Sequence, residues 1–210
     1  MAYLKDIFHP EIRTALKQGL YSYTFWGLLG LGFGLSYCNS NAAFGDGFTL
    51  YMLTSWFFFS ILSLIAVIDT QKLIVPDVLV FPLLVLGVFI APSVTSALWG
   101  VFFLGGGFWL IRWGSSLFLK QEAMGLGDVK LAAASGAWVG IWGIVPLLLV
   151  ASFSALFMLV MRRLLGKTHT PQPQTPFAPY LALGAWVAFT HGYGILKTLF
   201  TLRQTLLENF

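Results

Sequence analysis

Long apolar runs dominate this chain and limit the folds that it can adopt. Of its 210 residues, 58% are hydrophobic and only 10% are charged, whereas a soluble domain has about 25% charged residues. Several runs approach the roughly 20 residues that a helix needs to cross a bilayer, and the alternation typical of an outer-membrane barrel is absent. The sequence therefore predicts an all-α, polytopic membrane protein with about seven transmembrane helices. The runs lie at 20–38, 49–68, 73–91, 94–111, 129–142, 143–161 and 178–196.

The least certain division falls within 129–161, which is too long for one crossing. Gly143 and Pro146 are the helix-breaking residues in its middle, so we expect the turn there. Just before them, Gly136 and Gly140 have the four-residue spacing that favours close packing between helices.

The distribution of Lys and Arg orients the chain in the membrane. Short cytosolic loops carry an excess of these residues, and with the N-terminus inside, ten of the twelve fall on that side. Lys197 and Arg203 are the exceptions and leave open a C-terminal amphipathic segment on the membrane surface. We expect a cytosolic lead-in at 1–19, a transmembrane domain at 20–200 and a C-terminal tail at 201–210. This topology explains the net charge of +4, so we expect membrane lipid and no nucleic acid as a partner.

The sequence predicts no cleavable signal peptide, no internal disulfide and no metal site. Residues 1–19 hold five charged side chains before any long apolar stretch, unlike a cleavable signal peptide. Cys38 is the single cysteine, which excludes an internal disulfide and a Cys-rich zinc site. His169 has no second His or Cys beside it, so the sequence predicts no metal site.

Two short polar stretches interrupt the apolar sequence, and the first begins at Asp69. This stretch, Asp69-Thr-Gln-Lys-Leu-Ile-Val-Pro-Asp77, directly follows the run at 49–68. An acid at a helix C-terminus opposes the helix dipole, at a cost of a few tenths to about 1 kcal/mol, and an acid at the hydrocarbon edge indicates a functional site. Asp69 could instead sit in interfacial water or pair with Lys72. Asp77 follows a proline and could simply cap the next helix.

The second polar stretch, Glu122-Ala-Met-Gly-Leu-Gly-Asp-Val-Lys130, places two glycines, an acid and a base between apolar runs. Gly125 and Gly127 permit backbone conformations closed to other residues, so the loop can bring Asp128 to the start of a helix that begins at Val129. Asp is also a favoured N-cap, so a lone Gly-x-Gly-Asp is compatible with a purely structural role.

Asp69 and Asp128 together would suit the hydrolysis of a peptide bond. The intervening residues 70–127 suffice for two spans, which return both acids to the cytosolic side. In an aspartic hydrolase one carboxylate takes a proton from water, while the other, protonated, polarises the scissile carbonyl. Two acids within a few ångströms cannot easily both ionise, so a close pair supplies both states. This chemistry requires no metal and no other cofactor.

Around these residues the chain resembles the bacterial type IV prepilin peptidases, membrane aspartic proteases of the GxGD type. The resemblance covers roughly residues 20–195 and implies that Asp69 and Asp128 are the catalytic acids of a cytosol-facing endopeptidase in the bacterial inner membrane. It implies leader peptides of prepilins or pseudopilins as substrates. The motifs that carry it are Ile68-Asp69 with the following Leu-Ile-Val-Pro-Asp77, the stretch Glu122–Lys130, and Pro176-Phe-Ala-Pro-Tyr-Leu-Ala-Leu-Gly184. We place Asp77, Glu122, Gly125, Gly127 and Lys130 around the two acids as substrate-binding or supporting residues.

The chain departs from the family pattern in three ways. Typical bacterial members begin with another span and a cytosolic domain with paired Cys-x-x-Cys motifs, which is linked to N-methylation of the product with S-adenosylmethionine. This sequence has neither, so we expect peptidase activity without methyltransferase activity. Ala123 and Ala178 stand where glycine is usual, and both are small substitutions that leave the acids in place.

Two other functions are compatible with the same acids. A proton-coupled transporter could use them as a relay, although both fall at one membrane face and no repeated half is found. A non-catalytic assembly factor for a pilus or a secretion system is the other alternative.

Overall fold

The computed structural model describes residues 31–32, 48–119, 124–164 and 176–208, and every regular element in this part of the chain is a helix. The predicted all-α fold is thus confirmed for these residues, while the lead-in at 1–19 lies outside them. The helices follow one another as α4 (Phe48–Lys72), α5 (Asp77–Ile90), α6 (Val94–Gly100), the π-helix η1 (Val101–Gly105), α7 (Gly106–Leu119), α8 (Leu126–Leu164) and α9 (Ala178–Glu208).

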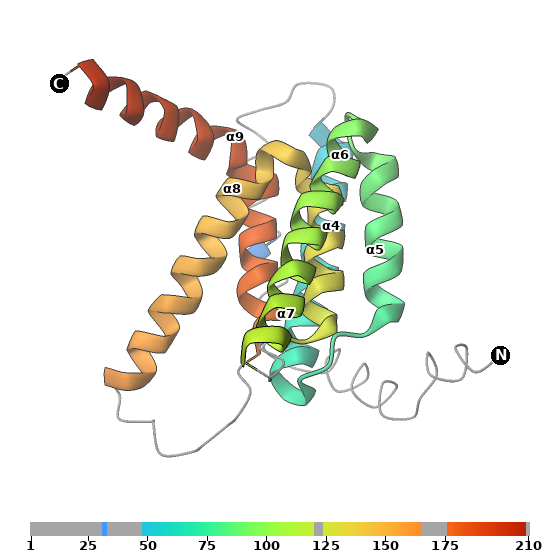
Figure 1. The fold of residues 1–210 in the computed structure, drawn as a ribbon. Helices are drawn as coiled ribbons and strands as arrows, with labels where there is room; N and C mark the ends of the chain where they lie inside the picture. Colours follow the sequence, from blue (N-terminus) through green and yellow to red (C-terminus); the bar gives the residue numbers. More distant parts are fainter. Residues whose placement is uncertain (1–30, 33–47, 120–123, 165–175, 209–210) are drawn as a thin grey trace.

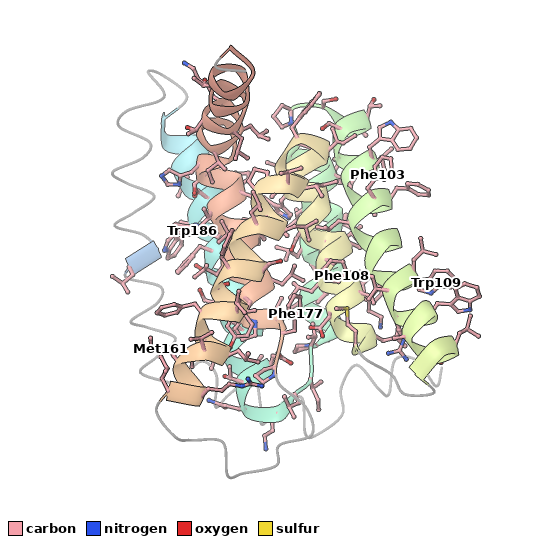
Figure 2. All side chains as sticks on the ribbon, turned by 60° about the vertical axis from the view of Figure 1, so that its left-hand side comes forward. Phe103, Phe108, Trp109, Met161, Phe177 and Trp186 are labelled. Atoms are coloured by element: carbon pink, nitrogen blue, oxygen red, sulfur yellow. The ribbon has the colours of Figure 1, made fainter. Side chains whose placement is uncertain are left out.

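Three stretches in the described part are long and apolar enough to cross a membrane: Leu53–Lys72, Val94–Leu117 and Leu126–Met161. The second is a continuous rod made of α6, η1 and α7, and large apolar side chains such as Phe103 and Trp109 point outward from it (Figure 2). About seven crossings stays a prediction, because most of the run at 20–38 lies outside the described residues and α5 is shorter than these three.

α8 turns back on itself at Gly140, and this corrects the turn that we expected at Gly143 and Pro146. Gly140 has φ 63° and ψ −175°, a conformation that side chains disfavour, whereas Pro146 lies inside the helix that follows. The Ile141 N–H donates to Ser96 Oγ at 3.3 Å, which satisfies a backbone group freed by the turn. α8 therefore consists of a first arm, 126–139, and a second arm, 141–164, which run in opposite directions (Figure 1).

α8 is the element around which the other helices pack. It contacts α5, α6, η1, α7 and α9, while α4 packs against α9 and α5. Figure 1 shows that the end of α4 and the starts of α5, α8 and α9 gather at one end of the bundle. The C-terminal part of α9 points away from the other helices (Figure 1) and stays helical to Glu208, through the boundary expected at residue 200.

The first arm of α8 touches the α6–η1–α7 rod backbone to backbone. A Cβ on Gly100 would overlap the carbonyl of Gly136, and a Cβ on Gly136 would overlap the carbonyl of Gly100. The close packing predicted at Gly136 is therefore confirmed. One turn along the rod, Gly105 ends the π-helix and faces Ala133 of the same arm. Small residues at such a crossing let two helices approach closely and gain van der Waals contact, which holds membrane helices together.

An aromatic cluster joins four helices in the core. Phe58 of α4 stacks on Trp138 of α8 with ring centroids 4.4 Å apart, and Phe189 of α9 packs edge-on against both rings at 5.4 and 5.7 Å. The Trp138 indole N–H donates to the carbonyl of Leu83 in α5 at 2.7 Å. The cluster therefore fixes the positions of α4, α5, α8 and α9 relative to one another.

We expect Gly136→Ala to destabilise the bundle by about 1–3 kcal/mol, because the added methyl has to push two backbones apart. Gly107→Ala in α7 is the matched control, since a Cβ there meets no atom within 4 Å. Denaturant titration of both purified variants in detergent measures the difference. Equal stability of the two variants would contradict this account of the helix crossing.

Candidate functional site

Asp69 lies in the last turn of α4 and is buried, with 5% of its surface exposed. The backbone N–H of Ala178, the first residue of α9, donates to Asp69 Oδ2 at 3.2 Å. This contact explains how an acid is tolerated at the unfavourable end of α4, because it also stands at the favourable N-terminal end of α9. Neither interfacial water nor an ion pair with Lys72 describes Asp69, since it is buried and the structure records no such pair among the described residues.

Asp128 is the third residue of α8, within the first helical turn. The helix begins at Leu126, three residues before the expected start at Val129, so Asp128 is not the N-cap. Its carboxylate instead reaches back and accepts a hydrogen bond from the backbone of Gly125. This is the geometry of the second half of a capping box, in which an acid at the third position satisfies the N–H of the capping residue.

The structure brings Asp69 and Asp128 together, as the sequence predicts. The two carboxyl groups are close enough to interact electrostatically. Each is fixed by one backbone hydrogen bond, from Ala178 and Gly125 respectively. Two acids from helices far apart in the sequence thus share one end of the bundle, and their catalytic role stays a prediction.

Asp77 and Lys130 form an ion pair beside the two acids. Lys130 Nζ lies 2.9 Å from Oδ1 and 2.8 Å from Oδ2 of Asp77, and 5.8 Å from the centre of the Phe81 ring. Asp77 does not cap α5: the capping position is Pro76, and no side chain bonds there. The pair joins the start of α5 to the second turn of α8, and each side chain is about one-third exposed.

Gly127 is required for close packing. Among the described residues the glycine with positive φ is Gly140, so neither Gly125 nor Gly127 uses the backbone freedom that we expected of them. A Cβ on Gly127 would lie 2.7 Å from Cβ of Val75, in the segment between α4 and α5, whereas a Cβ on Gly125 would make an ordinary 3.7 Å contact with Asp128 Oδ2.

Arg112 is a residue of the site that the sequence analysis missed. It lies in α7, and its Nη1 donates to the carbonyl of Met124, directly before the Gly-x-Gly-Asp turn. The available signal is an arginine directly after the apolar run 94–111, which we count only among the ten basic residues on the cytosolic side. The expected supporting residue Glu122 lies outside the described residues. In the part that the structure describes, no three His, Cys, Asp or Glu residues are grouped as a metal site would require.

Gly127→Ala is expected to lower the unfolding free energy by about 1–3 kcal/mol, because the new methyl has to displace Val75. Gly125→Ala is the matched control two residues away and should cost much less, since its methyl finds room. Thermal unfolding of the two variants in the same detergent compares them. A greater loss for Gly125→Ala would show that backbone conformation, and not packing, selects these glycines.

The Asp77–Lys130 pair is expected to contribute only about 0.2–1 kcal/mol, because water reaches both partners. A double-mutant cycle of Asp77→Asn and Lys130→Met isolates this coupling energy. We expect it to shrink when the salt concentration is raised to 1 M. A coupling that salt leaves unchanged would contradict a solvent-screened pair.

Comparison with known proteins places these elements in a family. The chain is 36% identical over 163 residues to a prepilin leader peptidase/N-methyltransferase of Aeromonas hydrophila, covering 73% of this chain and 53% of that protein. It is 38% identical over 141 residues to the protein of the same name from Pseudomonas aeruginosa, covering 63% and 47%. The chain thus spans about half the length of these relatives. No solved structure gives a significant match.

The sequence profile of the Type IV leader peptidase family matches residues 56–160. The matched segment runs from α4 to the second arm of α8 and contains Asp69, the Asp77–Lys130 pair and the Gly-x-Gly-Asp turn. Because this match covers half of the chain and includes both acids, the chain belongs to the Type IV leader peptidase family.

Proposed function

We propose that this protein is a membrane aspartic endopeptidase that removes leader peptides from prepilins or pseudopilins, with Asp69 and Asp128 as its catalytic acids. The observation that carries the proposal is the proximity of these two carboxyl groups, which lie close enough to interact electrostatically at one end of the bundle. Family membership and relatives named prepilin leader peptidase support the same reaction. They do not favour the transporter or the assembly factor.

Hydrolysis by such a pair needs one shared proton. The ionised carboxylate takes a proton from a water molecule as the oxygen attacks the scissile carbonyl, and the protonated acid hydrogen-bonds the carbonyl oxygen. When the tetrahedral intermediate collapses, a proton passes to the leaving amine. The proton belongs to the pair and not to either residue alone.

The site is rigid where the mechanism needs it to be. Asp69 is fixed by Ala178 and Asp128 by Gly125, so each acid keeps one oxygen on a backbone N–H. The Arg112–Met124 hydrogen bond holds the chain just before Asp128, and the Asp77–Lys130 pair holds the helix just after it. Such support keeps reacting groups within the narrow geometry that catalysis requires. In this role Asp77, Gly125, Gly127 and Lys130 are supporting residues, and Glu122 is proposed to complete them.

We further propose that the protein has about seven membrane crossings and that its acids face the cytosol. Basic residues support this orientation: Lys72, Arg112 and Lys130 lie in the last turn of α4, in α7 and in the first turns of α8, at the end of the bundle that carries the acids. The bacterial inner membrane is the corresponding location. The proposed activity is hydrolysis of the leader peptide, without transfer of a methyl group to the product.

Asp69→Asn and Asp128→Asn are each expected to reduce cleavage of a co-expressed prepilin by at least about 100-fold, because either change removes a proton carrier. Asp46→Asn is the control and should cleave normally. Asp46 lies in residues 39–48, between the predicted spans 20–38 and 49–68, and these residues hold no Lys or Arg and are therefore expected on the opposite face. Immunoblots of processed and unprocessed pilin, with the amount of each variant checked, give the readout. Mass spectrometry of the mature N-terminus then reports the cleavage site and any methylation.

Normal processing by either Asn variant would remove that acid from the mechanism. Failure of the unaltered protein to cleave any prepilin would overturn the proposed function as a whole.

A further inference from the structure

The segment Leu73–Pro76 joins α4 to α5 and is an irregular stretch close to both acids in the chain or in space. It begins four residues after Asp69, and its Val75 packs against Gly127, the neighbour of Asp128. The segment is therefore in a position to contact a peptide whose scissile bond lies between the two acids.

Most backbone groups of this segment have no hydrogen-bond partner in the part of the chain that the structure describes. Within the described residues, the N–H groups of Ile74 and Val75 and the carbonyls of Leu73, Ile74 and Val75 make no hydrogen bond. Unpaired backbone groups are costly away from water, and irregular backbone at membrane depth is tolerated where it lines a water-filled site or is buried in protein. No described residue occupies these groups, which leaves them for water in the free protein and for a peptide when one is bound.

The segment is also held in a fixed shape. Leu73 has φ 55°, a left-handed conformation that a leucine adopts only where its surroundings enforce it. At the other end Pro76 is fully buried with an extended backbone, φ −72° and ψ 122°. Between them the side chains of Leu73 and Ile74 are 46% and 42% exposed, so the segment offers apolar side chains together with free backbone groups.

A substrate presents the complementary chemistry. A peptide must be extended for water to reach its scissile carbonyl, and near hydrocarbon its own backbone groups then need partners. An extended peptide that lies beside a segment with unpaired backbone groups can form main-chain hydrogen bonds with it, which satisfies the backbone groups of both chains. Many peptide-recognising proteins bind their ligands in this way.

We propose that segment Leu73–Pro76 is the substrate-binding edge of the enzyme: it pairs with the extended stretch of substrate next to the scissile bond through the backbone of Ile74 or Val75. This inference rests on the proposed peptidase function. It assigns to the backbone of this segment the task of holding the peptide straight across Asp69 and Asp128.

The test uses the full chain in liposomes and a synthetic prepilin peptide that spans the cleavage site, with single N-methyl groups placed in turn along its backbone. Binding is measured on the Asp69→Asn variant by competition with a fluorescent copy of the peptide. Successive residues of a paired strand point their N–H groups to opposite sides. We therefore expect affinity to fall about tenfold or more at alternate positions and to change little between them.

A flat profile, or an equal loss at every position, overturns the inference. Cleavage of the unmodified peptide by the wild-type chain is measured in parallel. If that cleavage is absent, the proposed function fails; if it occurs with a flat profile, only the pairing fails.

A second measurement locates the contact on the protein. A photo-crosslinking residue at position 74 is expected to capture the peptide, whereas one at Phe89, 81% exposed near the other end of α5, should not. Ile74→Ala, which keeps the backbone amide, is expected to preserve the alternating N-methyl profile. Equal capture at both positions, or loss of the alternation in Ile74→Ala, counts against backbone pairing.

Discussion

A buried carboxylate at the end of one helix, held by the first N–H of another, sets the arrangement of this protein. Asp69 would destabilise α4 if it faced only its own helix dipole, and it is tolerated because Ala178 places the start of α9 against it. The contact requires α4 to end where α9 begins, although 109 residues separate the two in sequence. This contact therefore places the end of α4 and the start of α9 together at the end of the bundle that holds the site.

The second acid reaches that side through the packing of the first arm of α8. Backbone contact between Gly100 and Gly136 sets the distance of this arm from the rod, and the Trp138 cluster sets its position against α4, α5 and α9. Asp128 then lies in the first turn of the arm, next to Asp69. Packing far from the acids therefore decides whether they meet, so substitutions in the core and in the site can have the same effect on activity.

Much of the fold can be predicted from local sequence, because apolar runs and charged loops report directly on membrane and water. The α-helical class, the approximate extents of α4 and α5, and the meeting of Asp69 with Asp128 all follow from that pattern. The turn in α8 could not be placed, because Pro146 is the stronger breaker in isolation while the supporting Ser96 lies 45 residues away in sequence. The Asp77–Lys130 pair joins residues 53 apart in sequence, so no local pattern indicates it. The Arg112–Met124 contact spans only 12 residues, but the arginine's position alone does not show which carbonyl it binds.

The turn at Gly140 makes the first arm of α8 a short helix, and α5 is another short helix among long ones. At 1.5 Å per residue, α5 and the first arm of α8 each extend about 21 Å, against a hydrocarbon layer of about 30 Å. A bilayer that meets both short and long helices has to thin beside the short ones or admit water at their ends. The two acids lie at the end of these short helices, where the bilayer is thin. A hydrophobic helix of ordinary length that crosses the membrane beside them would extend past the hydrocarbon, and its terminal peptide bonds would reach the level of the carboxylates.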